Sequence, residues 1–407
     1  MKAIVPAPDD RPAPTVLALD TGSSSLKFGL YRVQLTTAEV MFSGEAEAIG
    51  EPVGRFHAED ASGVMLGDER NPIATQADAL VRIGKLLAEA HRGAPDAIGH
   101  RVVHGGPRLR RHCLIDEPVL GELEAASVFA PLHMPAALSA IRFAQARFPG
   151  IPQAACFDTA FHADMPDIAR VLPIAREVQS HGVQRYGFHG LSCESIVRQF
   201  VGGPPERLII AHLGAGASVT AVRAGQSIDT SMGLTPTGGM MMATRSGDLD
   251  PGVLLYLMRE KGFDAAMIED LVDRRSGLLG VSCASGDMRA LHDASASNPA
   301  ARLAVEMFCA AVAKQVAAMI TALGGVDALV FTGGIGENDG AVRAAICDHL
   351  SWIAVGLDQT RNRSATNPIS DADSRCKVLV LPSREDEEIA RHAWALSSAI
   401  ARGAELR

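Results

Sequence analysis

The chain has 407 residues, of which 47% are hydrophobic and 21% charged, and its formal net charge is −9. This length suits two domains, and the composition is typical of a soluble globular protein that buries large cores. The acidic balance argues against nucleic acid or an anionic membrane as the main partner, because either would require a broad basic surface.

The cysteines and the amino-terminal residues indicate the compartment. The seven cysteines stand singly, without a CxxC pair, which predicts reduced thiols rather than disulfides or a metal cluster. The leader MKAIVPAPDDRPAP has prolines and an acidic pair where a signal peptide needs an apolar stretch. No uninterrupted apolar run reaches the roughly 18 residues of a membrane span. We therefore expect a cytoplasmic protein with no membrane partner.

A strand–turn–strand pattern occurs near the start of the chain and again in its second half. Thr15–Asp20 (TVLALD) predicts a buried strand, TGSSS a tight turn and LKFGLYRV the returning strand. Arg207–Ala211 (RLIIA), the glycine-rich turn HLGAGAS and VTAVRAG repeat this order, so that Gly22 and Gly214 hold comparable places. A third unit has a strand at Asp327–Phe331, the turn TGGIGEN and a predicted helix through AVRAAICDHL.

Helical stretches at Gln76–His91, Pro135–Phe148 and Ala300–Leu323 accompany these strands and predict an α/β protein. The two related halves indicate a duplication with a ligand cleft between the resulting domains. We place the boundary near residues 150–160, so that residues 1–155 form the first domain and 156–385 the second. A final helix over 386–407 is expected to cross back over the first domain.

The first hairpin, Asp20–Lys27, can hold phosphate oxygens through its hydroxyls, its backbone N–H groups and its lysine. It is not a Walker A loop, because GxxxxGK[ST] is absent, and alone it is as readily a polar turn. Two such hairpins in matching places, together with TGGIGEN, favour an ATP site similar to that of actin, the sugar kinases and Hsp70.

Five further segments carry a specific resemblance. HRVVHGG, PLHMP, FDTAFH, RYGFHG and TRSGDLD occur in this order between residues 100 and 250. With them the chain resembles the acetate kinase family from Val16 to Ala390. The resemblance implies two duplicated actin-like, ribonuclease H-like domains with the active site in the cleft between them. It also implies direct in-line, reversible transfer of the ATP γ-phosphoryl group to acetate, a requirement for Mg²⁺ that Mn²⁺ can replace, and a homodimer formed through the second domain.

The resemblance assigns the catalytic residues. Arg101 and Arg245 match two active-site arginines, whose planar forks suit carboxylate and phosphoryl oxygens. His189 matches a hydrogen-bond donor to the transferring phosphoryl group. Asp158 matches the catalytic aspartate, and because a carboxylate acceptor needs no general base, we expect it to organise the metal and the arginines. Asp20 and Glu385 are the predicted metal residues, although Glu385 also opens an acidic run that is typical of a solvated helix start.

The binding residues are also implied by the resemblance. The acid's tail is expected to meet an apolar pocket, and ATP or ADP the three glycine-rich turns. The pocket residues are Val103, Leu132, Phe188 and Pro236. The nucleotide residues are Ser23, Ser25, Lys27, His212, Leu213, Gly214, Ala215, Gly216, Asp287, Met288, Arg289, Gly334, Ile335, Gly336, Glu337 and Asn338.

Three departures from the family pattern fall inside these motifs. Asp20 stands where Asn is usual, and two effects of its charge stay open: a firmer hold on Mg²⁺ or its waters, or repulsion of the phosphoryl group if the metal is misplaced. Ala215 replaces Asn and removes a donor near the phosphates, which we expect to weaken nucleotide binding by about 1.5–3 kcal/mol. Met134 and Ala137 replace two asparagines beneath His133. The catalytic residues are all retained.

Two alternatives stay open. The first is a propionate or butyrate kinase, although Val103 favours acetate, because a smaller residue there would admit propionate more easily. Since one methylene is worth only about 1–3 kcal/mol of discrimination, we expect modest activity on propionate in any case. The second is a catalytically weak ATP-binding regulator. A sugar kinase is disfavoured, because its hydroxyl acceptor needs a carboxylate base in place of paired arginines.

Overall fold

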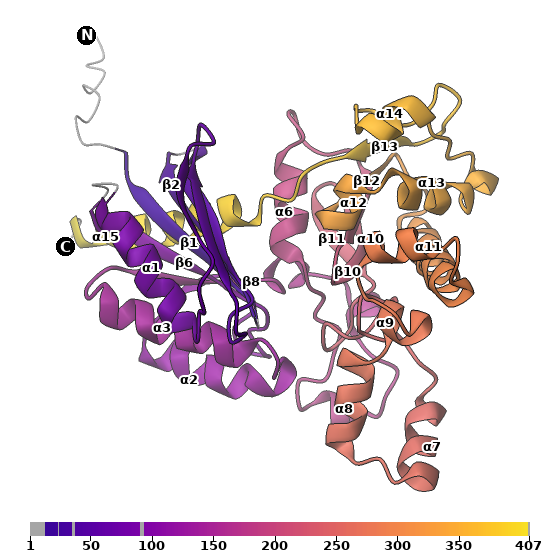
Figure 1. Cartoon of the computed structure of the whole chain (residues 1–407), viewed down its shortest axis with the longest axis horizontal. Coiled ribbons are helices and arrows are strands. Elements are labelled where there is room, and N and C mark those ends of the chain that lie inside the picture. Colours follow the sequence, from indigo (N-terminus) through magenta and orange to yellow (C-terminus); the bar gives the residue numbers. More distant parts are fainter. Residues whose placement is uncertain (1–12, 23, 35–36, 90–92, 406–407) are drawn as a thin grey trace.

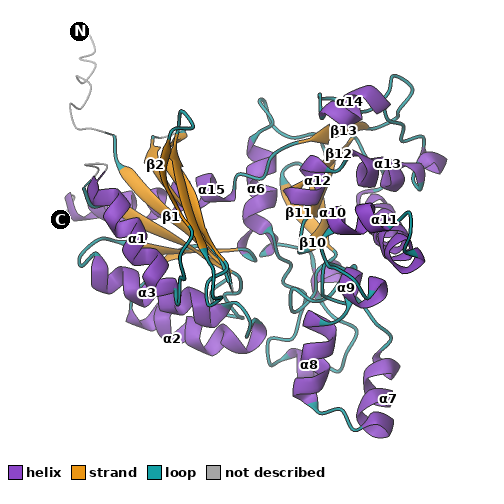
Figure 2. Cartoon of the chain, viewed as in Figure 1, coloured by secondary structure: helices purple, strands orange, loops and turns teal. Residues whose placement is uncertain are grey.

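The computed structural model describes residues 13–22, 24–34, 37–89 and 93–405 (Figure 1). Ser23, one of the predicted nucleotide residues, lies outside them. The described chain forms two α/β halves that lie side by side and are joined at two places (Figure 2).

The first half is built on an eight-stranded sheet in the order β5-β4-β3-β2-β1-β6-β8-β7. Residues Val16 to Leu19 of β1 are fully buried, because helices cover both faces of the sheet. Leu17 and Leu19 pack toward α1 and α3, whereas Val16 and Ala18 pack toward α15. The strands are β1 (Thr15–Thr21), β2 (Leu26–Val33), β3 (Ala38–Glu47), β4 (Arg55–Asp60), β5 (Met65–Glu69), β6 (Ala97–Val102), β7 (Cys113–Leu114) and β8 (Gln153–Phe157), and the helices are α1 (Gln76–Glu89), α2 (Glu117–Ala126), η1 (Ser127–Phe129) and α3 (Met134–Arg147).

The second half is built on a five-stranded sheet in the order β11-β10-β9-β12-β13. Its strands are β9 (Arg207–Leu213), β10 (Ala217–Arg223), β11 (Gln226–Thr230), β12 (Ala328–Thr332) and β13 (Lys377–Val380). Its helices are η2 (Ala160–His162), α4 (Asp167–Arg170), α5 (Arg176–Gln179), α6 (Gly190–Arg198), α7 (Pro251–Lys261), α8 (Ala265–Arg274), α9 (Gly277–Ser282), α10 (Met288–Ala294), α11 (Pro299–Leu323), α12 (Gly333–Asn338), α13 (Gly340–Asp348), η3 (Ser351–Ile353) and α14 (Gln359–Ser364).

The two sheets share one arrangement. Strands β3-β2-β1-β6-β8 match β11-β10-β9-β12-β13. The central strand of each set, β1 or β9, is antiparallel to its hairpin partner and parallel to its other neighbour. Asp20 and His212 are each the sixth residue of a seven-residue strand with the same burial pattern. The turns are closed alike, by Gly22 N–H donating to Ser25 O and Gly214 N–H donating to Gly216 O, both at 2.9 Å. The predicted hairpins and the repeat of their pattern are therefore confirmed.

Two elements lie at the predicted boundaries. Strand β8 pairs with β6 as far as Phe157, so a boundary after residue 155 would cut a strand of the first sheet. The final helix, α15 (Glu385–Glu405), begins at Glu385 rather than Asp386. It returns from the second half to pack on β1, β6 and β8 (Figure 1). The turn TGGIGEN is also different, because it forms the short helix α12.

Helix α11 is long and apolar enough, by length and composition alone, to cross a membrane. It packs instead against β10, α9 and α13, with Phe308, Val312 and Val316 buried in the core of the second half. A core helix of this kind explains its composition.

Candidate active site

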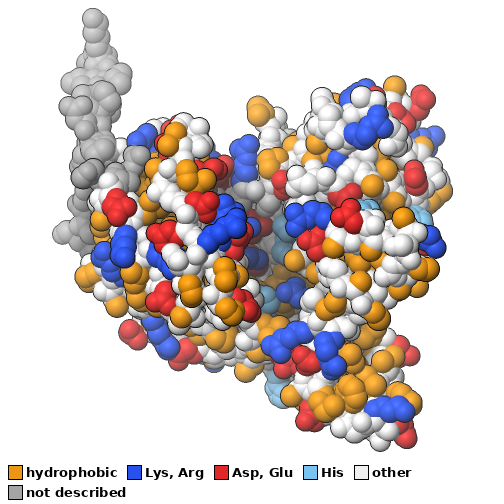
Figure 3. Space-filling view, in the orientation of Figure 1, with side chains coloured by type: hydrophobic (Ala, Val, Ile, Leu, Met, Phe, Trp, Pro, Cys, Tyr) orange, Lys and Arg blue, Asp and Glu red, His pale blue; other side chains and the backbone are white. Residues whose placement is uncertain are grey.

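Two adjoining cavities lie between the halves, with volumes of about 700 and 240 Å³. Figure 3 shows the molecule hollowed at this place, with Lys, Arg and His side chains on the walls. Among the predicted residues, the larger cavity is lined by Asp20, Lys27, Arg101, His189, His212, Gly214, Ala215, Gly216, Gly334, Glu337 and Glu385. The smaller one is lined by Ser25, Arg101, Val103, Asp158, Phe188, His189, Gly216, Pro236 and Arg245.

Arg101, at the carboxyl end of β6, joins the two cavities and is held by carboxylates. Its Nε and Nη2 donate to Asp158 Oδ2 at 3.0 and 2.7 Å, and its Nη1 donates to Asp20 Oδ1 at 2.8 Å. Burial alone would lower the pKa of the Arg101 guanidinium, but these two carboxylates raise it well above its ordinary value. Burial also raises the pKa of Asp158 to about 6, against the lowering effect of Arg101. The arginine is therefore fixed in place and permanently charged.

His189 lies at the start of α6 in a left-handed conformation, with φ of 57°. A non-glycine residue in this region is strained, and such strain collects at functional sites. Two contacts hold the turn: Gly190 N–H donates to Asp158 O at 2.8 Å, and His189 Nδ1 lies 3.0 Å from Ser218 Oγ. Burial lowers the pKa of His189 well below its ordinary value, and the nearby His212 and two arginines lower it further. The imidazole is therefore neutral.

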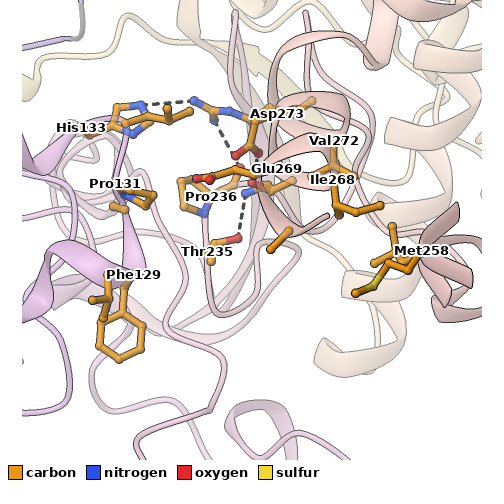
Figure 4. Close-up of a pocket in the computed structure, with 17 residues that line it drawn as sticks. Phe129, Pro131, His133, Thr235, Pro236, Met258, Ile268, Glu269, Val272 and Asp273 are labelled. Atoms are coloured by element: carbon orange, nitrogen blue, oxygen red, sulfur yellow. Dashed lines mark hydrogen bonds between the residues drawn. The ribbon is translucent and has the colours of Figure 1, made fainter. Parts of the chain in front are cut away.

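Arg245 reaches the smaller cavity from the opposite half. Its Nη1 donates to Pro236 O at 3.3 Å and its Nη2 lies 3.3 Å from His133 Nε2 (Figure 4). Burial lowers the pKa of Arg245, and it also lowers that of His133, to about 4, with help from the Arg245 charge. His133 is therefore a neutral acceptor for the arginine. His133 was not among the predicted site residues, although it lies in the PLHMP segment.

The apolar wall of the smaller cavity is formed by Val103, Phe188 and Pro236. Leu132 lines instead a third cavity of about 420 Å³, which shares His133, Pro236 and Arg245 with the smaller cavity. Figure 4 shows this third cavity between the Phe129–His133 segment and the helices α7 and α8. Met134 and Ala137, the two positions predicted to depart from asparagine, are buried residues of α3.

The turns predicted to hold phosphate lie on either side of the larger cavity. Lys27 pairs with Asp20 across the β1–β2 hairpin, and burial would lower its pKa, but Glu45, Asp20 and the acidic start of α15 raise it. On the other side His212 stacks on His189, with ring centroids 4.1 Å apart. Its Nδ1 lies 2.8 Å from Ser192 Oγ, which in turn accepts from Ser383 Oγ at 3.0 Å. Neither serine was identified from the sequence, because no motif marks them.

The start of α15 is not a solvated acidic face. Glu385, Asp386 and Glu387 line the larger cavity, and Glu388 is buried against Arg198 at 2.6 Å. Burial raises the pKa of Asp386 to about 7, and the Asp20 and Glu385 carboxylates add to this effect. Asp20, Asp158, Glu385 and Asp386 together exceed the positive charge of Arg101 and Lys27. Such a surplus of hard oxygen donors fits a divalent cation such as Mg²⁺.

Some predicted nucleotide residues do not reach the described cavities. Leu213 and Gly336 are buried, Met288 is a core residue, and Ile335 packs against the core. Asp287 caps α10 and forms an ion pair of 2.8 Å with the exposed Arg289. Asn338 donates to Gly334 O at 2.9 Å. Glu337 does line the cavity, where it accepts from Gly333 N–H at 2.9 Å and Ser383 N–H at 3.0 Å.

Comparison with known proteins agrees with this geometry. Residues 15–391 match the sequence profile of the acetokinase family. The chain belongs to this family. The chain is 42% identical over 390 residues to an acetate kinase from Nitrobacter hamburgensis, covering 94% of this chain and 96% of that one. It is 42% identical to an acetate kinase from Stutzerimonas stutzeri over 397 residues, covering 95% and 100%.

Two solved structures are also similar to this acetokinase. A propionate kinase from Francisella tularensis superposes with a TM-score of 0.87 at 36% identity, covering 94% of this chain and all of that one. An acetate kinase from Porphyromonas gingivalis gives 0.82 at 36% identity with the same coverage. The fold is therefore the actin-like ATPase fold of acetate and propionate kinases, as predicted. The acetokinase is accordingly a phosphotransferase whose acceptor is a carboxyl group.

Proposed function

We propose that this acetokinase transfers the γ-phosphoryl group of ATP to acetate, reversibly and in line, giving acetyl phosphate and ADP. The observation that carries the proposal is the small cavity with Arg101 and Arg245 on its wall, one from each half, beside the apolar Val103, Phe188 and Pro236. Two guanidinium groups suit an anionic acceptor, and the cavity adjoins the larger one that would hold the nucleotide.

In this proposal the two arginines bind the acid and then the equatorial phosphoryl oxygens, whose charge must be neutralised in the transition state. We assign Ser218 Oγ–H as the donor to His189 Nδ1, 3.0 Å away, so that the ring proton of His189 is on Nε2. A Cβ added at Gly216 would lie 3.2 Å from His189 Nε2 and 3.4 Å from Arg245 Nη1. Glycine at this position therefore leaves the space between these two groups free for the phosphoryl group. His189 then donates to the transferring group without needing a charge.

Asp158 acts by orientation. It binds Arg101 through both carboxylate oxygens and, through its carbonyl, holds the backbone at Gly190. It takes no proton from the acid, because acetate is already ionised at neutral pH. One aspartate thus fixes both the arginine and the histidine of the site.

Asp20 and Glu385 would hold Mg²⁺, or Mn²⁺ in its place, with Asp386 beside them. The metal would supply charge neutralisation at the β- and γ-phosphates. Lys27 and the Gly214–Gly216 turn would bind the phosphate oxygens through an ammonium group and backbone N–H groups. Gly334 and Glu337 would border the rest of the nucleotide, whereas Asp287 and Arg289 would need to move to reach it.

We also propose that the chain consists of two duplicated domains divided after Phe157, with α15 completing the first. A cytoplasmic homodimer that meets through the second domain, without nucleic acid or membrane partners, is the assembly we expect. Analytical ultracentrifugation tests the dimer, and a monomer at micromolar concentration would contradict it.

The activity is tested by incubating the protein with MgATP, hydroxylamine and acetate, propionate or butyrate, and measuring the acyl hydroxamate. We expect product with acetate and a lower kcat/KM with propionate, because Val103 narrows the pocket. A propionate kcat/KM well above that for acetate would replace acetate as the substrate. No product with any acid would refute the kinase proposal and leave the ATP-binding regulator.

A further inference from the structure

Four aromatic rings form a cluster behind the acid pocket. His104 lies at its centre, with ring centroids 4.9 Å from Phe129, 4.5 Å from Tyr186 and 5.5 Å from Phe188. Phe129 and Tyr186 complete the cluster at 6.1 Å. His104 is fully buried, and it contacts neither the larger cavity nor the smaller one.

Each predicted wall residue of the acid pocket is close in the chain to this cluster. Val103 directly precedes His104, and Phe188 is itself a member. Leu132 follows Phe129 by three residues, and Figure 4 shows Phe129 at the edge of the space that this segment borders. Pro236 follows Leu234, the cluster's hydrogen-bond partner, by two residues. Movement of the cluster would therefore move the pocket wall from several sides.

Hydrogen bonds fix the orientation of the His104 ring. Gly106 N–H donates to Nδ1 at 2.8 Å, so Nδ1 has no proton and Nε2 carries it. Nε2–H in turn donates to Leu234 O at 3.2 Å. Burial lowers the pKa of His104 to about 4, in agreement with a neutral ring.

This bond joins the two halves. His104 follows β6 of the first sheet, whereas Leu234 lies in the loop after β11 of the second. The same loop is held by Tyr186 N–H, which donates to Gly233 O at 3.0 Å. The loop that carries Pro236 is thus tied on one side to His104 and on the other to Tyr186.

We propose that His104 is a positioning residue that fixes the width of the acid pocket and thereby sets its discrimination between acetate and longer acids. The inference rests on the proposed function of the small cavity as the acid site. The ring supports Phe188, and the cross-half hydrogen bond holds the Pro236 loop at a set distance from Val103. Without either, the wall relaxes and a longer tail gains room.

Two substitutions separate the ring from the hydrogen bonds. His104→Phe keeps the ring but leaves Leu234 O and Gly106 N–H without partners, whereas His104→Gln keeps an amide donor and acceptor but removes the ring. We expect each to raise the propionate-to-acetate ratio of kcat/KM about threefold to tenfold, within the range that one methylene supports, with the KM for ATP unchanged. His349→Gln, at the exposed carboxyl end of α13 and outside the described cavities, is the control and should leave the ratio unchanged.

The ratio is the measurement that a merely structural residue would not move. Equal losses for both acids in both variants would overturn the proposal. If neither variant folds, Phe129→Leu removes the ring contacts with His104 and Tyr186 from a half-buried position and should move the ratio in the same direction. An unchanged ratio there would equally overturn the proposal. Acetate and propionate binding are also measured by ligand-observed NMR without turnover. An inactive wild-type protein would refute the proposed function, whereas an unchanged ratio of dissociation constants in the variants would refute the role of His104.

Discussion

Replacing Asp158 by Asn separates the orientation of Arg101 from the stability of the fold. The carboxylate accepts three hydrogen bonds from Arg101, one at Oδ1 (3.1 Å) and two at Oδ2 (3.0 and 2.7 Å). An amide of the same size keeps one acceptor oxygen, and in its better orientation it retains the two bonds made to Oδ2. One charge-assisted bond is lost, worth about 1.5–3 kcal/mol. Because each 1.4 kcal/mol is roughly a factor of ten, kcat/KM for acetate should fall about tenfold to 150-fold.

The stability of the same variant should not fall. Burial raises the pKa of Asp158 to about 6, so the stabilisation from its protonated form is present below its ordinary pKa of 3.8 and is lost as the pH rises through 6. At pH 7.5 the wild-type fold carries the burial cost of an ionised carboxylate. Asn removes this cost, which offsets the weaker attraction to the buried Arg101.

The assay pairs steady-state kinetics with thermal unfolding at pH 7.5. Asp164→Asn, at an exposed ion pair with Arg111, is the matched control and should change neither quantity. A loss of activity below threefold, or a fall in melting temperature that parallels the loss of activity, would refute the reasoning.

Three further outcomes are expected. Gly190→Ala should destabilise the fold by about 1–3 kcal/mol in denaturant titrations, because the new Cβ would lie 2.3 Å from Asp158 O. The control Gly121→Ala in α2 places a Cβ with nothing within 4 Å and should not destabilise the fold. Equal effects of the two substitutions would be inconsistent with this clash. Arg245→Ala should lower kcat about 100-fold or more and change ATP affinity less than twofold, as measured by fluorescent-nucleotide competition, and equal losses would make Arg245 structural. Burial lowers the pKa of His162 to about 4, so its neutral form stabilises the fold above pH 6.5 and this contribution is lost as the pH falls to 4. The difference in free energy of unfolding between wild type and His162→Gln should therefore shrink over that range. A difference that stays constant with pH would contradict the shift.

The elements that carry the fold could be predicted because their signals are local. The apolar run at Thr15–Thr21 and its repeat at Arg207–Leu213 are strands buried on both faces, and a continuous apolar run is what that environment requires. Strand β8 continues two residues past the predicted boundary at 155, to Phe157, which is as apolar as the residues before it. Local pattern does not show where a sheet stops.

The site was predicted in part. The motifs HRVVHGG, FDTAFH, RYGFHG and TRSGD bring Arg101, Asp158, His189 and Arg245 to one cavity, as the resemblance implied. Ser192 contacts His212 and accepts a hydrogen bond from Ser383, which is 191 residues away in sequence. The two serines meet because the segment between β13 and α15 packs against α6. No single-segment signal could have shown them.

The acidic run at Glu385 illustrates the same limit. Four consecutive acidic residues are typical of an exposed helix start, yet three of them line the cavity and the fourth is buried against Arg198. The helix starts at the junction of the halves, where the cavity wall rather than solvent faces its first turn. Asp287 and Arg289 show the opposite case. They were predicted as nucleotide residues from a matching motif, but their side chains pair with each other at the surface.

The central claim is that Arg101 and Arg245 bind a small carboxylate in line with the γ-phosphoryl group of ATP. The most direct test follows the ³¹P NMR spectrum of the protein with MgATP and acetate. We predict an acetyl phosphate resonance that grows with that of ADP in equal amounts. With Arg101→Ala or Arg245→Ala in place of the wild-type protein, it should grow far more slowly, by about 100-fold or more for Arg245→Ala. ADP and inorganic phosphate without acetyl phosphate, or undiminished acetyl phosphate formation by either variant, would contradict the claim.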